Sequence, residues 1–363
     1  MNLEGIYKAL FSQTDAQWDA FKTICELMGG GEAFASLCEQ DFTSALEALE
    51  ALNPVLQKHV FRGGAENPFG PAKERFEVAG GDATDLHRRV AEQLIILGLH
   101  RERVPATSVL ARALFILGST IPNTTNRIIF CRDAVLPKVY TGETIIYGLS
   151  GERALIPAKE DATRGYLGDL TEEPRDGFLT SADLEPTLET YSKEVEGKRE
   201  PTEAGAMSVL AERLLGDHAV VTIDAKAKPG KARPDTEDTA KEAGAKLLEA
   251  GALAEGFRLA IVSDACFPGQ VDQVRMGLLK AGVSLSPDQI EFYGMGYPDA
   301  VLIDSAAYTQ ILASSVLAER VHSRMSRLRL ECSMGAAVEG TFGAASAVEA
   351  PVNAAAGPGG AAP

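Results

Sequence analysis

Two carboxylates stand where a parallel α/β protein usually places its reactive groups. Glu203 lies in "PTEAGAM" and Asp264 ends the apolar run "LAIVSD". A carboxylate in a crevice can transfer a proton or hydrogen-bond a ribose hydroxyl. We therefore take Glu203 and Asp264 as candidate catalytic residues.

Eight further residues lie at the end of a predicted strand or at the start of the helix that follows it, and each is small, carries a hydroxyl or is charged. We take them as candidates for ligand binding: Gly118, Ser119, Ser150, Gly151, Arg153, Asp235, Thr236 and Ser263. Glycine permits a tight turn, and the amides that follow it could hold a phosphate or carboxylate at a helix start. Arg153 offers a fork that suits the same anions. Asp235 is a natural N-cap and leaves Thr236 at the crevice.

Each segment also has an ordinary structural interpretation, which the sequence leaves open. The turn after residue 117 can be simple helix capping, and Arg153 can pair with Glu152 or Glu143 on the surface. Glu203 can be a first-turn glutamate that favours the helix dipole.

Motifs of covalent catalysis and metal binding are missing from the sequence. Cys266 has no His near it in the chain, and neither GxSxG nor HExxH occurs. We assign no metal ligands, although Glu203, Asp235, Asp238 and Asp264 could together hold Mg²⁺, which stays open as an alternative cofactor.

The elements that must position these residues are short apolar runs that alternate with helical segments. The predicted strands are residues 111–118, 144–150, 218–224, 257–264 and 290–294, and the predicted helices are residues 122–136, 201–215, 236–250, 269–282 and 305–327. Strands that are apolar throughout and are each followed by a helix indicate a parallel sheet covered on both faces. The fold class is therefore α/β, with a doubly wound, mainly parallel, five-stranded Rossmann-like sheet. Its candidate residues should meet at the carboxyl ends of the strands.

The rest of the chain divides around this sheet. Residues 1–105 read as an all-α domain, in which Thr14 caps a helix and further helices begin from Asp41 or Thr43 and near Asp85. The Rossmann-like domain covers residues 106–332, with an acidic insertion at 154–200 that could be a lid. Residues 333–363 form an Ala/Gly/Pro-rich tail that we expect to be disordered.

Composition narrows the classes of partner. The 35 Lys and Arg against 51 Asp and Glu give a net charge of −16, which argues against nucleic acid or an anionic membrane as the main partner. No run of 18 apolar residues and no signal peptide is present. Five scattered cysteines without a CxxC pair fit a reducing compartment, so we expect a cytoplasmic protein.

Taken together, the segments resemble the YdcF/SanA/ElyC-type family, whose function is largely undefined. The matching residues are "LGS" at 117–119, Ser150-Gly151, Glu203-Ala204 with Met207, Thr236 within "PDTED", and "IVSDACFP" at 261–268. The resemblance covers roughly residues 110–285. The resemblance implies a Rossmann-like fold, with binding of S-adenosylmethionine or a nucleotide-like ligand suggested for one branch of the family.

This chain departs from the family where many members carry a His and then an Arg after the fourth strand, since Cys266 and Gly269 stand there. Three functions therefore stay open. The first is a protein that binds a nucleotide-like small molecule, with or without turnover. The second is a metal-assisted phosphoester hydrolase or transferase. The third is a non-catalytic protein that docks a protein partner through its N-terminal helices.

Overall fold

The computed structural model describes residues 1–62, 64–70, 83–155, 179, 181–216, 218–229 and 234–335. Most of the predicted insertion and nearly all of the predicted tail lie outside the described residues. The predictions of a lid and of a disordered tail therefore fall outside the part of the chain that the structure describes.

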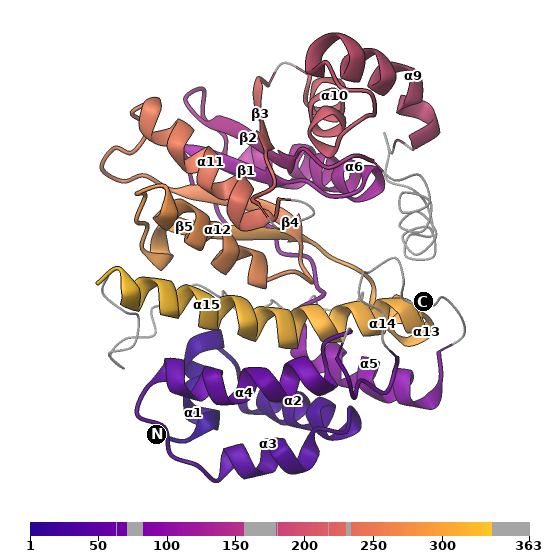
Figure 1. The fold of residues 1–363 in the computed structure, drawn as a ribbon, viewed down its shortest axis with the longest axis vertical. Helices are drawn as coiled ribbons and strands as arrows, with labels where there is room; N and C mark the ends of the chain where they lie inside the picture. Colours follow the sequence, from indigo (N-terminus) through magenta and orange to yellow (C-terminus); the bar gives the residue numbers. More distant parts are fainter. Residues whose placement is uncertain are drawn as a thin grey trace, which may run out of the picture.

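A five-stranded parallel sheet forms the centre of one half of the molecule (Figure 1). Its strands are β1 (Ala113–Leu117), β2 (Ile145–Gly151), β3 (Val220–Ala225), β4 (Leu259–Asp264) and β5 (Ile290–Met295), in the order β3-β2-β1-β4-β5. All side chains of β1 and β4 are buried, because these strands are central and covered on both faces. The five strands predicted from apolar runs are confirmed.

Helices cover both faces of this sheet. The helices that follow the strands are α6 (Ile121–Phe130), α10 (Glu203–Leu215), α11 (Thr236–Glu249) and α12 (Gly269–Lys280). Phe115 and Ile261 share one apolar core with α11 and α12, whereas Leu114 and Val262 join a second core with α6 and α10. Successive side chains along each strand thus pack alternately into the two cores, one on each face of the sheet. The doubly wound α/β class is confirmed.

Shorter elements complete this half. They are η2 (Cys131–Val135), α7 (Leu136–Val139), α9 (Ser181–Tyr191), η3 (Ser192–Glu196) and η4 (Pro287–Gln289). The short helix α13 (Asp299–Asp304) instead packs against the helices described below (Figure 1).

The N-terminal region is helical, as predicted. It contains α1 (Leu3–Phe11), α2 (Asp15–Leu27), α3 (Gly31–Cys38), α4 (Ala45–His59) and α5 (Asp85–Leu97). The predicted Thr14 cap is confirmed by its acceptance of the Gln17 N–H. The predicted start near Asp85 is also confirmed, since α5 begins at Asp85 and Thr84 caps it. The start predicted from Asp41 or Thr43 was wrong, because the Ser44 hydroxyl caps α4, which begins at Ala45.

The last helices return to the N-terminal ones. α14 (Ala306–Ala313), the π-turn η5 (Ser314–Glu319) and α15 (Arg320–Ser333) follow one another without a break and lie between the sheet and the N-terminal helices (Figure 1). One apolar core runs from Leu3 through this helix to Leu114 of the sheet. We refer below to the N-terminal helices together with α14, η5 and α15 as the helical half.

No helix in the described part of the chain is both long and apolar enough to span a membrane.

Candidate functional site

A cavity of about 280 Å³ opens at the carboxyl ends of the strands. It lies beside β1 and β4, the central pair from which the chain winds in opposite directions, and ligands of open α/β sheets bind at such switch points. Its lining from the sheet half includes Gly118, Ser119, Thr120, Asn123, Arg127, Ser150, Gly151, Arg153, Glu203, Pro234, Asp235, Thr236, Thr239, Phe267, Gly269, Gln270 and Gln273. Five segments that are distant in sequence thus meet at one site.

The turns after β1 and β2 lie unusually close together. A Cβ on Gly118 would overlap the Ser150 hydroxyl and come within 2.8 Å of the Leu149 carbonyl oxygen. The Ser119 N–H donates to Thr124 Oγ1 at 2.9 Å, which fixes the turn at the start of α6. Glycine at 118 therefore lets these two turns form one wall.

Two hydroxyls of this wall are buried without a partner. Thr120 and Ser150 are each 4% exposed, and neither hydroxyl has a hydrogen-bond partner among the residues that the structure describes. A buried polar group without a partner costs about 1–3 kcal/mol. Both residues line the cavity, so a polar ligand there could remove this cost.

Four helices begin at the cavity, and they differ in how their N-termini are capped. Thr202 caps α10, and Asp235 caps α11 by accepting the Asp238 N–H at 3.0 Å, as predicted for Asp235. The helices that follow the central strands, α6 and α12, have no side-chain cap. Their partial positive charge favours an anionic group of a ligand between them.

Arg153 and Glu203 form an ion pair at one side of the cavity. Their side chains are only 11% and 13% exposed. The predicted surface partners of Arg153 are engaged elsewhere, since Glu143 pairs with Arg112 and Glu152 with Lys198. A candidate cation and a candidate carboxylate thus face the cavity together.

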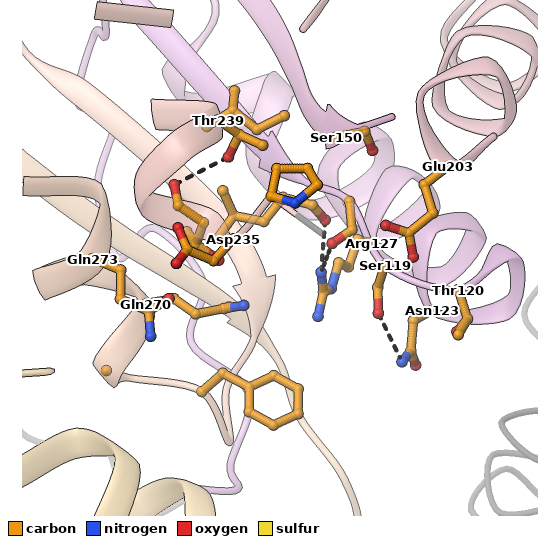
Figure 2. A pocket seen from close by; sticks show the side chains of 18 of the residues that line it. Ser119, Thr120, Asn123, Arg127, Ser150, Glu203, Asp235, Thr239, Gln270 and Gln273 are labelled. Carbon is orange, nitrogen blue, oxygen red and sulfur yellow. Dashed lines mark hydrogen bonds between the residues drawn. The ribbon is translucent and has the colours of Figure 1, made fainter. Parts of the chain in front are cut away.

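Arg127 forms the floor of the site, and Figure 2 shows it between Glu203 and Asp235. Its Nη2 donates to Asp264 Oδ2 at 2.7 Å and its Nη1 to the Leu117 carbonyl at 2.7 Å. Burial alone would lower the pKa of Arg127, but the Asp264 carboxylate beside it raises that pKa above its ordinary value. The pair holds the ends of β1 and β4 together.

The cavity gathers most of the predicted site residues. Eight of them line it: Gly118, Ser119, Ser150, Gly151, Arg153, Glu203, Asp235 and Thr236. Ser263 and Asp264 lie one layer behind, where Ser263 donates to Gln270 and Asp264 accepts from Arg127. These two residues support lining side chains rather than facing the cavity themselves.

Sequence reasoning missed several lining residues. Asn123 and Arg127 belong to the run "IPNTTNRIIF", every residue of which is buried. Five consecutive polar residues in a helix between apolar strands were a usable signal. Arg62, Ser315, Glu319 and Ser323 also line the cavity, although they lie in the helical half, far from any strand end in sequence.

The titratable side chains of the lining are carboxylates and arginines. Among the described residues it contains no His, Cys or Lys, and Cys266 is buried outside it. Proton transfer would thus fall to the carboxylates, of which Glu203 and Asp235 lie on opposite sides of the site in Figure 2. Within the described ranges no three His, Cys, Asp or Glu side chains are grouped so that they could hold a metal ion.

Comparison of the chain with protein-family models, with curated proteins and with solved structures gives no match.

Proposed function

We propose that this chain is a YdcF-like protein that binds a nucleotide-like small molecule, such as S-adenosylmethionine, at the carboxyl edge of its sheet. The observation that carries the proposal is the pair of buried, unpartnered hydroxyls of Thr120 and Ser150 in the cavity. Hydroxyls of this kind suit the ribose and base atoms of a nucleoside.

The charges of the lining support an amphoteric ligand. Three arginines and three carboxylates line the cavity: Arg62, Arg127, Arg153, Glu203, Asp235 and Glu319. The uncapped starts of α6 and α12 favour an anionic group, while Asp235 favours a hydroxyl or a cation. A volume of about 280 Å³ is near the lower end of the ~300–1,000 Å³ usual for ligand pockets, which favours a small ligand.

The family resemblance supports the same site. Its matching positions Gly118, Ser150, Glu203 and Thr236 line one cavity, although they come from four separate segments. Glu203 is the residue that we propose for any proton transfer.

Mg²⁺-assisted phosphoester chemistry has less support. Glu203 pairs with Arg153, Asp264 with Arg127 and Asp238 with Lys228. No observation favours docking of a protein partner over ligand binding. A cytoplasmic location is supported by free thiols at all five cysteines, three of them buried.

The test is calorimetric titration of the full chain with S-adenosylmethionine, AMP and adenosine at up to millimolar concentration. We expect at least one of these to bind, and Ser150→Ala to raise its dissociation constant about fivefold, the loss of one hydrogen bond of about 1 kcal/mol. The same variant should leave the ligand-free melting temperature unchanged or higher, because it removes an unsatisfied group. Ser36→Ala, at an exposed position on α3, is the control. Absence of binding by the wild type to all three probes would refute the proposal.

A further inference from the structure

The cavity has a second wall that comes from the helical half. Arg62 follows α4, Ser315 and Glu319 belong to η5, and Ser323 belongs to α15. These residues line the same cavity as the turns that follow the strands, so a ligand that fills the cavity would touch both halves of the molecule.

The π-turn η5 is what presents this wall. A π-turn inserts an extra residue into a helix and is frequent at functional sites. Here its Ala318 carbonyl accepts from Gln57 Nε2 of α4 at 3.3 Å. Ser314 Oγ accepts from Arg62 Nη1 at 3.3 Å, and Arg62 also pairs with Glu319. The N-terminal helices therefore hold η5 in position through two side chains.

Ser315 carries the second observation that points to a ligand. Its side chain is buried, with the residue 1% exposed, and its hydroxyl has no hydrogen-bond partner within the described ranges. A helical serine can bond to a carbonyl of the preceding turn, but Ser315 does not. Ser315 lines the same cavity as Thr120 and Ser150 of the sheet half.

The two walls are joined at the start of α12. A Cβ on Gly269 would lie 3.1 Å from Arg320 Cα and 3.3 Å from the Glu319 carbonyl oxygen, so the backbones are nearly in contact. Gln273 Nε2 donates to Ser323 Oγ at 3.3 Å. The helical wall is thereby held beside the uncapped N-terminus of α12, where an anionic group is favoured.

We propose that the helical half is part of the binding site: the Ser315 hydroxyl hydrogen-bonds the ligand, and Arg62 pairs with an anionic group of that ligand at the start of α12. The ligand class is a nucleoside that carries a carboxylate or a phosphate. This inference rests on the proposed function and adds to it the residues that select the anion.

The experiment is calorimetric titration of full-length Arg62→Gln and Ser315→Ala with three probes. S-adenosylmethionine carries a carboxylate, AMP carries a phosphate, and adenosine carries neither. For the anionic probe that the wild type prefers, Arg62→Gln should raise the dissociation constant about tenfold, because one charge-assisted hydrogen bond is lost. The dissociation constant of adenosine should change by less than about twofold, because adenosine carries no anionic group. The preferred probe identifies the anion.

Ser315→Ala should weaken all probes that bind about fivefold without lowering the melting temperature of the ligand-free protein. Arg89→Gln on α5 and Ser36→Ala on α3, both at exposed positions, are matched controls. If Ser150→Ala weakens binding while Arg62→Gln and Ser315→Ala bind as the wild type does, the helical wall has no role and the proposed function stands. Equal weakening of adenosine and the anionic probe by Arg62→Gln would overturn its role in anion recognition. No binding by the wild type refutes both proposals.

Discussion

Arginine side chains at the site have two different tasks. Arg127 is 1% exposed and bonded to Asp264 on one side and to backbone carbonyls on the other, so it maintains the floor of the cavity. Arg153 keeps 11% of its side chain exposed and pairs with Glu203 at the wall. The first arginine stabilises the fold, whereas the second lies at the cavity in which we propose that a ligand binds.

Asp264→Ala should therefore destabilise the protein strongly. The substitution leaves the Arg127 guanidinium buried without its carboxylate, which typically costs about 3–5 kcal/mol. Urea denaturation measures this loss of unfolding free energy. Glu143→Gln, which breaks the exposed pair with Arg112, should cost less than about 1 kcal/mol. Similar losses for the two variants would contradict a structural role for Asp264.

Residue types at the strand ends could be predicted from the sequence, but their partners could not. The sequence predicts Glu203 as a catalytic residue and Arg153 as a ligand-binding residue, but nothing in it indicates that their side chains pair. Asp264 was chosen as catalytic because it ends a buried strand. Its carboxylate is instead taken by Arg127, 137 residues away in the chain, and such pairings appear only when the tertiary structure is formed.

The elements of the sheet half were more predictable than their ends. The apolar runs were most continuous in β1 and β4, because strands that are buried on both faces leave no polar positions. The edge strands β3 and β5 are only partly buried and carry polar residues such as Thr222 and Glu291. Pro201 was expected to begin a helix, but Thr202 is the N-cap and α10 begins at Glu203.

The π-helix η5 had no signal in the sequence. Its contacts with Gln57 of α4 and with Arg62 join residues that lie more than 250 positions apart, and such contacts appear only in the tertiary structure.

Gly151 at the end of β2 packs closely against the segment that precedes α11, and a substitution there tests this packing. A Cβ on Gly151 would overlap the ring of Pro234, which precedes α11. Gly151→Ala should therefore destabilise the protein by about 1–3 kcal/mol, the usual cost of overpacking.

Pro234→Ala removes the atoms that collide, so the double variant should be about as stable as Pro234→Ala alone. Thermal and urea denaturation of the four proteins gives the coupling between the two sites. Additive losses would show that the clash does not limit this packing.

At the scale of the whole molecule, the two halves are joined by buried charges. Asp272 of α12 accepts from Arg324 Nε at 3.0 Å and from Arg327 Nε at 2.7 Å, both on α15. Arg324 Nη1 also donates to the Leu10 carbonyl of α1 at 2.6 Å. The sequence predicted separate regions at 1–105 and 106–332, but it did not indicate that the last helix would connect them.

The free energy of unfolding should depend on pH in the acid range, because Asp272 lies at this junction. Burial raises the pKa of Asp272, but Arg324 and Arg327 outweigh it and lower that pKa below its ordinary value. Its contribution is therefore complete above the unfolded-state pKa of about 4 and is lost as the pH falls through the lower folded-state pKa. Asp272→Asn should cost about 3–5 kcal/mol at pH 7, and its difference from the wild type should shrink below pH ~4.

Urea midpoints at a series of pH values check this expectation. The exposed Asp19→Asn variant should follow the wild type throughout. A difference for Asp272→Asn that persists unchanged in acid would show that the carboxylate is not the titrating group.

The position of α15 also bears on how the protein is made. Residues 1–62 leave the ribosome long before α15, yet Glu50 of α4 pairs with Arg329 at 2.7 Å and α4 packs against α15. Translation proceeds at about 5–20 residues per second, so the apolar face of α4 that packs against α15 stays uncovered for tens of seconds at the slower rate. During that interval the nascent chain exposes an apolar surface that a chaperone can recognise, and only completion of α15 withdraws it.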